Sequence, residues 1–254
     1  MSYEHSEFYF TKENLDLYLK ELAKEYRKLV GKSMPAELIL IGGASVMLNY
    51  GFRDMTADID AMIEATSAMK DAINKVGDLY QLPKDWLNAE FQYTDSYSPK
   101  LIQYSVYYRT FSNVLTIRTV SEEYLVAMKL RSGRRYKSDL SDVLGILKEH
   151  QKKGEPITIE RIQKAVCDLY GSWDSLPKSS QSFIENAMKD GDFEKLYQQT
   201  IVEEKEMKIM LSQFEKDHPG VLNDSNIDEI SERFARKLEK ANTIDTLKKI
   251  KTNK

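Results

Sequence analysis

The sequence predicts an α+β fold, in which a small mixed sheet forms a core that is followed by an all-helical C-terminal domain. Two short apolar runs, at 37–41 and 58–63, have the length of buried strands and flank a glycine pair. From Ile157 onward, apolar residues recur at helical spacing. The chain of 254 residues is 41% hydrophobic and 30% charged, which is enough apolar material for a substantial core. We therefore expect three parts: an N-terminal helical segment in 1–35, the mixed-sheet core in 36–152 and the helical domain in 153–254.

The first third of the chain alternates helices and strands. Leu15, Leu19 and Leu22 follow a helical spacing, and they predict a helix over 11–30 that begins at Thr11 and ends at Gly31. The next elements expected are a strand at 37–41, a helix at 44–50 ended by Gly51, a strand at 58–63, and a helix from Thr66 or Ser67 to about Val76.

The middle of the chain predicts two more strands and two helices. Residues 101–111 and 114–120 are rich in aromatic and β-branched residues, which favour strands. A helix should run from Ser121 to Ser132 and end at Gly133, and another from Ser138 or Asp139 to His150. Further helices are expected at about 158–170, 178–189, 192–215, 226–241 and 243–251.

Composition excludes several classes of protein. No apolar run approaches the roughly 20 residues that span a bilayer, so we expect no membrane partner. The acidic, polar segment 1–7 is unlike a secretory signal, and the single cysteine, Cys167, allows no internal disulfide. We therefore expect a cytoplasmic protein in which Cys167 is an ordinary buried thiol. A net charge of −3 argues against a basic coat for long nucleic acids, although Arg131, Arg134, Arg135 and Lys137 form a local basic group.

The residues that suggest chemistry begin at the glycine pair. Gly42 and Gly43 have no Cβ, so backbone N–H groups in this turn can approach a phosphate closely. Ser45 lies near the start of the following helix, where its hydroxyl could share the anion. The alternative is a plain tight turn.

Two carboxylates follow the glycines. Asp58 and Asp60 are two apart in a predicted strand, so they should share a face roughly 6 to 7 Å from each other. Adjacent carboxylates repel unless a cation lies between them, and Mg²⁺ (or Mn²⁺) is the usual partner. A backbone-rich turn beside such a pair suits a nucleoside triphosphate. The alternative is a solvated or salt-bridged strand end.

A second group of charged residues lies between 129 and 142. Lys129 belongs to an otherwise apolar helix, where a lysine often extends its ammonium group to solvent. Asp139 and Asp142 are three apart and share a helix face. Asp139 could polarise an acceptor hydroxyl, orient Lys129, support a metal or simply cap the helix. We expect Asp142 to orient Lys129 or an arginine.

Both groups resemble known signatures. Gly42, Gly43 and Ser45, followed by Arg53, Thr56, Asp58 and Asp60, resemble the motif of polymerase-β-like nucleotidyltransferases, although the fourteen-residue gap from Gly43 to Asp58 is slightly long. Residues 127–130, Arg134 and 137–142 resemble the helix-pair motif of minimal nucleotidyltransferases of the abortive-infection and toxin–antitoxin type. Together the resemblance covers about 36–150.

The resemblance implies a Mg²⁺-dependent enzyme that transfers an NMP from an NTP to a hydroxyl of an RNA, such as tRNA, or of a protein. It also implies a role as a toxin, with a cognate antitoxin as partner, or in phage defence. By resemblance, Asp58 and Asp60 are catalytic and hold the metal, Lys129 contacts the triphosphate and Asp139 is also catalytic. The residues implied in nucleotide binding are Gly42, Gly43, Ser45, Arg53, Thr56, Arg134 and Asp142.

One departure from the family pattern leaves the activity open. Many polymerase-β-like enzymes take a third metal carboxylate from a later strand, but 114–120 contains no acid. Asp139 could supply it, with Asp95 as a more distant source. Otherwise the chain is a catalytically degenerate nucleotide-binding or protein-interaction module. A third reading is a helical interaction protein in which the acid pair is incidental and no nucleotide stabilises the fold.

Overall fold

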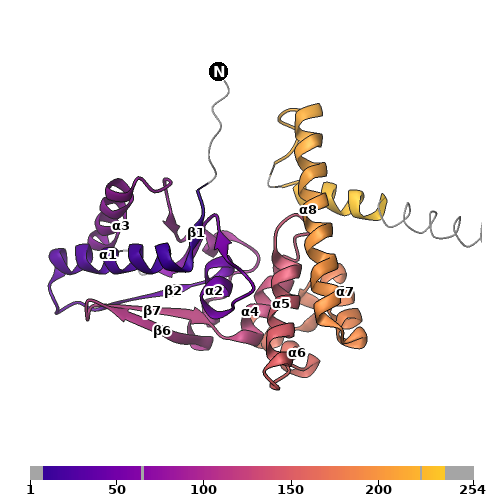
Figure 1. Ribbon diagram of the computed structural model, residues 1–254, viewed down its shortest axis with the longest axis horizontal. Coiled ribbons are helices and arrows are strands. Elements are labelled where there is room, and N and C mark those ends of the chain that lie inside the picture. Colours follow the sequence, from indigo (N-terminus) through magenta and orange to yellow (C-terminus); the bar gives the residue numbers. More distant parts are fainter. Residues whose placement is uncertain (1–7, 64–65, 224, 238–254) are drawn as a thin grey trace, which may run out of the picture.

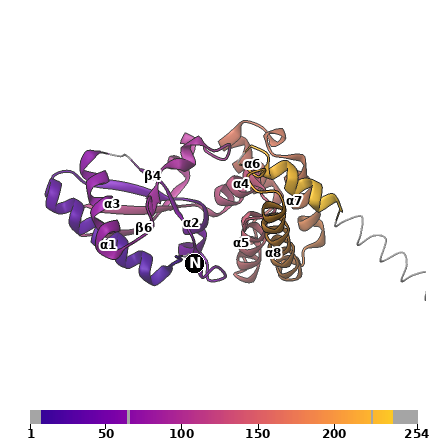
Figure 2. The same cartoon turned by 90° about the horizontal axis from the view of Figure 1, so that it is seen from above.

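The computed structural model describes residues 8–63, 66–223 and 225–237. The molecule is elongated, with a sheet and its covering helices at one end and a group of helices at the other (Figures 1 and 2). The expected order, a mixed sheet in the N-terminal half followed by helices, is confirmed.

Five strands form the mixed sheet. In spatial order they are β5 (Leu87–Asn88), β4 (Ile59–Ile63), β2 (Ala36–Leu40), β7 (Leu115–Val120) and β6 (Ser105–Phe111). β2 pairs antiparallel with β4 and parallel with β7, while β5 runs parallel to β4 and β6 antiparallel to β7. The strands predicted at 37–41, 58–63 and 114–120 are present within one residue at each end.

The strand predicted over 101–111 begins later than expected. Pro99–Tyr104 forms a short 3₁₀ helix, η2, because a proline at the first helical position favours a helical turn and donates no hydrogen bond to a ladder. A second unpredicted feature is a small ladder of β1 (Phe10–Thr11) and β3 (Met55–Thr56), which ties the start of the described chain to the segment before β4.

The two faces of the sheet bury different side chains. Leu38 and Leu40 of β2, with Ile59 and Ala61 of β4, pack in one cluster with α1 (Lys12–Val30) and α3 (Ser67–Tyr80), which cover this face (Figure 1). Side chains alternate along a strand, so Asp60, between Ile59 and Ala61, points to the opposite face. That opposite face is turned toward the helical end of the molecule.

Caps predicted from the sequence set several helix ends. Thr11 caps α1 and Gly31 follows its last residue, as expected. Gly133, in the left-handed conformation, ends α4 (Glu122–Ser132). In contrast, α2 (Gly42–Asn49) begins at the glycine pair itself, two residues earlier than predicted.

The helical end is built on α4. The other helices are α5 (Asp139–Lys152), α6 (Ile159–Tyr170), α7 (Lys178–Asp190) and α8 (Phe193–Asp217). Leu125 of α4, Leu144 of α5 and Ile162 of α6 belong to one hydrophobic cluster that also includes Ile39 of β2. This cluster extends across residue 152, so α4 and α5 share their buried surface with the helices that follow the expected core.

A last helix covers 227–237, where Ala235 packs against Met207 and Leu211 of α8. The helix predicted over 226–241 is present as far as the chain is described, and the one predicted over 243–251 lies outside the described residues. No helix in the described part of the chain has the length and apolar character needed to cross a membrane.

Cys167 is exposed, so the prediction of a buried thiol was wrong. α6 buries Ala165, Val166 and Leu169, and the helical turn carries the position between Val166 and Leu169 to the solvent side.

Candidate functional site

A pocket of about 380 Å³ lies between the start of β4 and the helices α4 and α5. This volume is within the usual range for small-molecule sites. Three stretches of chain meet in it: the glycine turn with the acid pair, the segment after β5, and the connection between α4 and α5. The lining comprises Gly42, Asp58, Asp60, Glu90, Phe91, Tyr93, Thr94, Met128, Lys129, Ser132, Arg134, Lys137 and Asp139.

The two carboxylates of the acid pair repel each other. Asp58 immediately precedes β4 and Asp60 lies within it. Burial, together with the charge of Asp58, raises the pKa of Asp60 above its ordinary value, although Lys137, Arg134 and Lys129 act in the opposite direction. A divalent cation would remove this repulsion, so the chemistry of the pair fits a bound metal ion.

Thr56 supports Asp58 rather than the ligand. Its side chain is buried, and Thr56 Oγ1 lies 3.1 Å from the carbonyl oxygen of Asp58 and 3.4 Å from Asp58 Oδ1. The β1–β3 ladder in turn fixes Thr56, which pairs with Phe10. Thr56, which the sequence predicts to contact the nucleotide, is not among the residues that line the pocket.

The two glycines have different surroundings. Gly42 has a φ of +56° and lies against the acid pair, since a Cβ added there would be 3.6 Å from Asp60 Oδ2. At Gly43 a Cβ would be 2.6 Å from both Arg53 Nη2 and Thr56 Oγ1. Two side chains therefore occupy the space that a Cβ at position 43 would need. Only Gly42 of the pair lines the pocket.

Ser45 also differs from the expectation. It is fully buried, and its Oγ accepts a hydrogen bond of 3.1 Å from the backbone N–H of Val120. This bond joins α2 to the end of β7. Ser45 is not among the residues that line the pocket.

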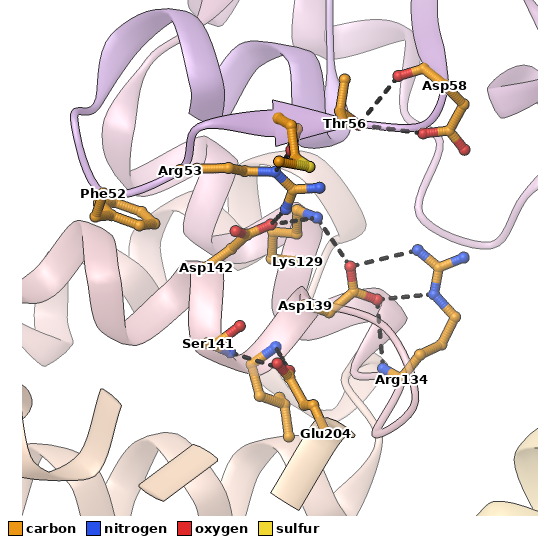
Figure 3. A network of polar contacts seen from close by, with 12 residues as sticks. Phe52, Arg53, Thr56, Asp58, Lys129, Arg134, Asp139, Ser141, Asp142 and Glu204 are labelled. Carbon is orange, nitrogen blue, oxygen red and sulfur yellow. Dashed lines mark hydrogen bonds and ion pairs between the residues drawn. The ribbon is translucent and has the colours of Figure 1, made fainter. Parts of the chain in front are cut away.

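Lys129 lies at the centre of a buried network (Figure 3). Its Nζ is 2.9 Å from Asp139 Oδ1 and 2.8 Å from Asp142 Oδ2, and the residue is only 6% exposed. Burial alone would lower the pKa of Lys129, but the carboxylates of Asp139 and Asp142 outweigh this effect and raise it. The ammonium group therefore stays charged beside the pocket.

Arginines close the network at both ends (Figure 3). Arg134 Nε is 2.7 Å from Asp139 Oδ2, and Arg53 Nη1 is 2.5 Å from Asp142 Oδ2. Arg53 thus pairs with Asp142, and it is not among the residues that line the pocket. The predicted contact of Asp142 with Lys129 and an arginine is present.

Both carboxylate oxygens of Asp139 bind cations of this network. Burial would raise the pKa of its carboxyl group, but Lys129 and Arg134 outweigh burial and hold it well below the usual range. One oxygen faces Lys129 and the other faces Arg134. Asp95 is the alternative source of a third ligand. Its backbone carbonyl accepts a hydrogen bond from Arg131. Within 8–63, 66–223 and 225–237, no three His, Cys, Asp or Glu side chains could together hold a metal.

The pair Asp58 and Asp60 would therefore be the protein's contribution to a metal site. Two carboxylates are sufficient for Mg²⁺ when substrate phosphates and water complete the shell.

The local basic group is mostly engaged within the protein. Arg131 bonds the Asp95 carbonyl, Arg134 pairs with Asp139, and Arg135 Nε lies 3.2 Å from Glu232. Lys137 is exposed, lines the pocket and has no ion pair with any residue that the structure describes. Of these four cations, Arg134 and Lys137 line the pocket, and Lys137 is the one without an ion pair to a described residue.

Two supporting contacts escaped the sequence analysis. Glu204 of α8 accepts hydrogen bonds of 3.1 Å from the backbone N–H groups of Leu140 and Ser141, at the start of α5. No local sequence pattern predicts a contact between residues more than 60 positions apart. Gly145 of α5 leaves room for the ring of Phe52, because a Cβ there would lie 2.4 Å from that ring. A glycine inside a helical pattern is a signal of such close approach.

An acid pair at the start of β4, lining one pocket with a buried lysine and an arginine, has the chemistry that suits a metal ion and an anionic ligand together. The chain belongs to a family described as nucleotidyltransferases of unknown function (DUF6036), whose model matches residues 18–149, a little over half of the chain. No curated protein and no solved structure matches it. The matched range contains the whole acid pair and the Lys129 network, so the family supports nucleotidyl transfer as the general activity of this site.

Proposed function

We propose that the protein is a Mg²⁺-dependent (or Mn²⁺-dependent) nucleotidyltransferase that moves an NMP from an NTP to a hydroxyl group. The observation that carries this proposal is the meeting of Asp58 and Asp60 with Lys129, Arg134 and Lys137 around one pocket. Nucleotidyl transfer needs metal-binding acids and cations for the leaving pyrophosphate, and both are present there.

Asp58 and Asp60 would hold the metal ion, which supplies polarisation of the α-phosphate when bound. Thr56 keeps Asp58 in place, and Gly42 lets the backbone lie close to Asp60. The acceptor oxygen forms its bond to the α-phosphorus as the bond to pyrophosphate breaks, and the hydroxyl proton passes to water. Lys129, Arg134 and Lys137 offset the negative charge that develops on pyrophosphate.

Asp139 and Asp142 act on Lys129 in this proposal. They hold its ammonium group charged and fix its direction, while Arg53 and Arg134 hold the two carboxylates. Asp139 is thus a positioning residue, since both of its oxygens are directed to cations of the protein.

The acceptor that we propose is an RNA, such as tRNA, or a protein hydroxyl. The resemblance of the motifs to toxin–antitoxin and abortive-infection enzymes supports a toxin or phage-defence role with a cognate antitoxin. Lys137 is available for one phosphate, and the net charge of −3 favours a small acceptor end over a long nucleic-acid duplex.

The test is incubation of the protein with each α-³²P-labelled NTP, Mg²⁺ and bulk tRNA. We expect label on RNA or on protein, and its loss in Asp58→Asn/Asp60→Asn. Asp54→Asn is the matched control, because Asp54 is an exposed acid of the same segment and does not line the pocket. Equal labelling by the wild type and the double variant would refute the proposed role of the acid pair.

A second candidate, a degenerate nucleotide-binding module, is favoured by the two-carboxylate metal site among the described residues. It predicts Mg²⁺-dependent and NTP-dependent thermal stabilisation without any transfer. A nucleotide at a hundred times its dissociation constant stabilises the native state by about 2.7 kcal/mol, which is easily measured. The absence of both transfer and stabilisation would leave the helical interaction protein.

A further inference from the structure

Tyr93 is the aromatic side chain of the pocket with the most open surface. It ends the short 3₁₀ helix η1 (Glu90–Tyr93), lines the pocket and is 83% exposed. Its ring and hydroxyl make no hydrogen bond, ring contact or ion pair with any residue in the described ranges. A single exposed tyrosine is ordinary on a protein surface. Tyr93 is of functional interest because it lines a pocket that also contains charged residues.

The wall that carries Tyr93 starts beside the acid pair. β5 runs parallel to β4, with Asn88 opposite Asp60, and η1 begins two residues after Asn88. Phe91 of η1 and Met128 of α4 line the same pocket and are almost fully buried. The pocket therefore combines two chemistries: charged groups from β4 and the α4–α5 connection, and an apolar, aromatic part from η1 and Met128.

A nucleoside triphosphate has the same two chemistries, because an anionic chain is joined through ribose to a flat π surface. We propose that Tyr93 is the stacking platform for the nucleobase of the bound NTP. This inference rests on the proposed function, in which Lys129, Arg134 and Lys137 take the triphosphate. Every base has a π face, so stacking on a tyrosine contributes to affinity without selecting strongly among the four bases.

The test is direct measurement of binding by titration calorimetry, with Mg²⁺ and no acceptor. The probes are the four NTPs and inorganic tripolyphosphate, which carries the charge but no base. We expect Tyr93→Ala to raise the dissociation constant of the best NTP about tenfold, within the range measured for base–aromatic stacking. Its affinity for tripolyphosphate should stay within about twofold of wild type, as for other surface substitutions.

Two variants serve as controls. Tyr93→Phe keeps the ring and should bind the NTP like wild type. Tyr107→Ala removes another exposed tyrosine, 63% exposed on β6 and outside the pocket, and should also leave binding unchanged.

Three results would overturn the inference. Unchanged NTP affinity in Tyr93→Ala would mean that the base lies elsewhere. Equal losses for NTP and tripolyphosphate would mean that the substitution disturbs the charged part of the pocket. If wild-type protein binds neither probe, the proposed function fails and the inference fails with it, an outcome distinct from the first two because it precedes any substitution.

Discussion

Lys129 is a buried cation between two buried carboxylates, and each carboxylate meets a further arginine. The five groups alternate in sign from Arg53 through Asp142, Lys129 and Asp139 to Arg134. Bringing such charges out of water is costly, and the cost is offset only while every member has its partner. The network therefore makes the site sensitive to single substitutions that an exposed pair would tolerate.

We expect Lys129→Met to destabilise the protein by about 3 kcal/mol, because it leaves Asp139 and Asp142 as neighbouring buried acids. Urea denaturation measures the change in the free energy of unfolding. Lys164→Met is the control, since Lys164 is itself exposed and pairs with Asp168 on its own helix, and it should change stability by less than about 0.5 kcal/mol. Similar, small effects of both substitutions would argue that the network is not held as described.

Gly43 provides a second test at the same scale. Gly43→Ala would place a methyl group against Arg53 and Thr56, so we expect a loss of about 1–3 kcal/mol in the free energy of unfolding. Gly51→Ala, in open space nearby, should be close to neutral. A neutral Gly43→Ala would show that Arg53 can move away without cost.

Part of the site could be predicted from single residues and their spacing. The acid pair and the contact of Asp142 with Lys129 depend on separations of a few residues or on one helix pair. The partner of Arg53 could not be predicted: Asp54 is the nearest acid along the chain, whereas Asp142 is 89 residues away and is brought close only by the tertiary fold. The buried positions of Ser45 and Thr56 likewise depend on β7 and on the β1–β3 ladder.

At the scale of elements, the helix that carries Asp139 and Asp142 is held by later parts of the chain. Ser138 provides no side-chain cap for α5, and Glu204 of α8 accepts the free N–H groups in its place. The helix over 227–237 contacts the connection between α4 and α5. There, Tyr136 donates a hydrogen bond to Asp228 and Arg135 pairs with Glu232. The C-terminal helices thus stabilise the start of α5 and the connection that carries cations of the pocket.

The cap makes stability depend on pH. Burial raises the pKa of Glu204 to about 8, Asp142 and Asp139 act in the same direction, and hydrogen bonds from Ser141 act against it. Between the ordinary value of 4.5 and about 8, the native state keeps a proton that the unfolded chain has lost. The free energy of unfolding should therefore fall as pH rises through this window, by roughly 1.4 kcal/mol per pH unit.

Glu204→Gln keeps an acceptor oxygen for the two N–H groups but has no proton to lose. Its stability, measured by urea denaturation between pH 5 and about 8, should be flatter with pH than that of wild type by roughly this slope. Glu206→Gln, at an exposed position of the same helix, should follow the wild-type curve. Parallel curves for Glu204→Gln and wild type would mean that Glu204 is ionised throughout.

Elements with strong local signals could be predicted, and short ones could not. Thr11, Gly31 and Gly133 mark helix ends through their own backbone and side-chain chemistry. β1, β3 and β5 contain two residues each and are defined by partners distant in the sequence, and the short turn η1 follows β5 directly. The wall that carries Tyr93 belongs to this second group, so its place in the pocket required the tertiary structure.

At the scale of the whole molecule, the pocket joins the sheet to the helical group. Its acids come from the start of β4 and its cations from α4 and the connection to α5. A ligand that bridges these groups contacts both the sheet and the helical group. Binding should therefore restrain two regions that are far apart in the sequence.

Hydrogen exchange measured by mass spectrometry tests this expectation. With saturating Mg²⁺ and NTP, exchange should slow in peptides that cover 42–60 and in peptides that cover 122–142. α1, on the far side of the sheet, should be little changed. Asp58→Asn/Asp60→Asn should lose the Mg²⁺-dependent part of the effect, and protection limited to one of the two regions would contradict a bridging site.

The contact between Phe52 and Gly145 has a consequence for how this family can evolve. The ring occupies the space where any side chain at 145 would begin, so a larger residue there would push Phe52 away and strain the ion pair of the adjacent Arg53 with Asp142. Homologues should therefore show linked substitutions: a larger residue at the position of Gly145 should occur with a smaller one at the position of Phe52. Such covariation would record the same steric constraint across lineages that the structure displays in a single molecule.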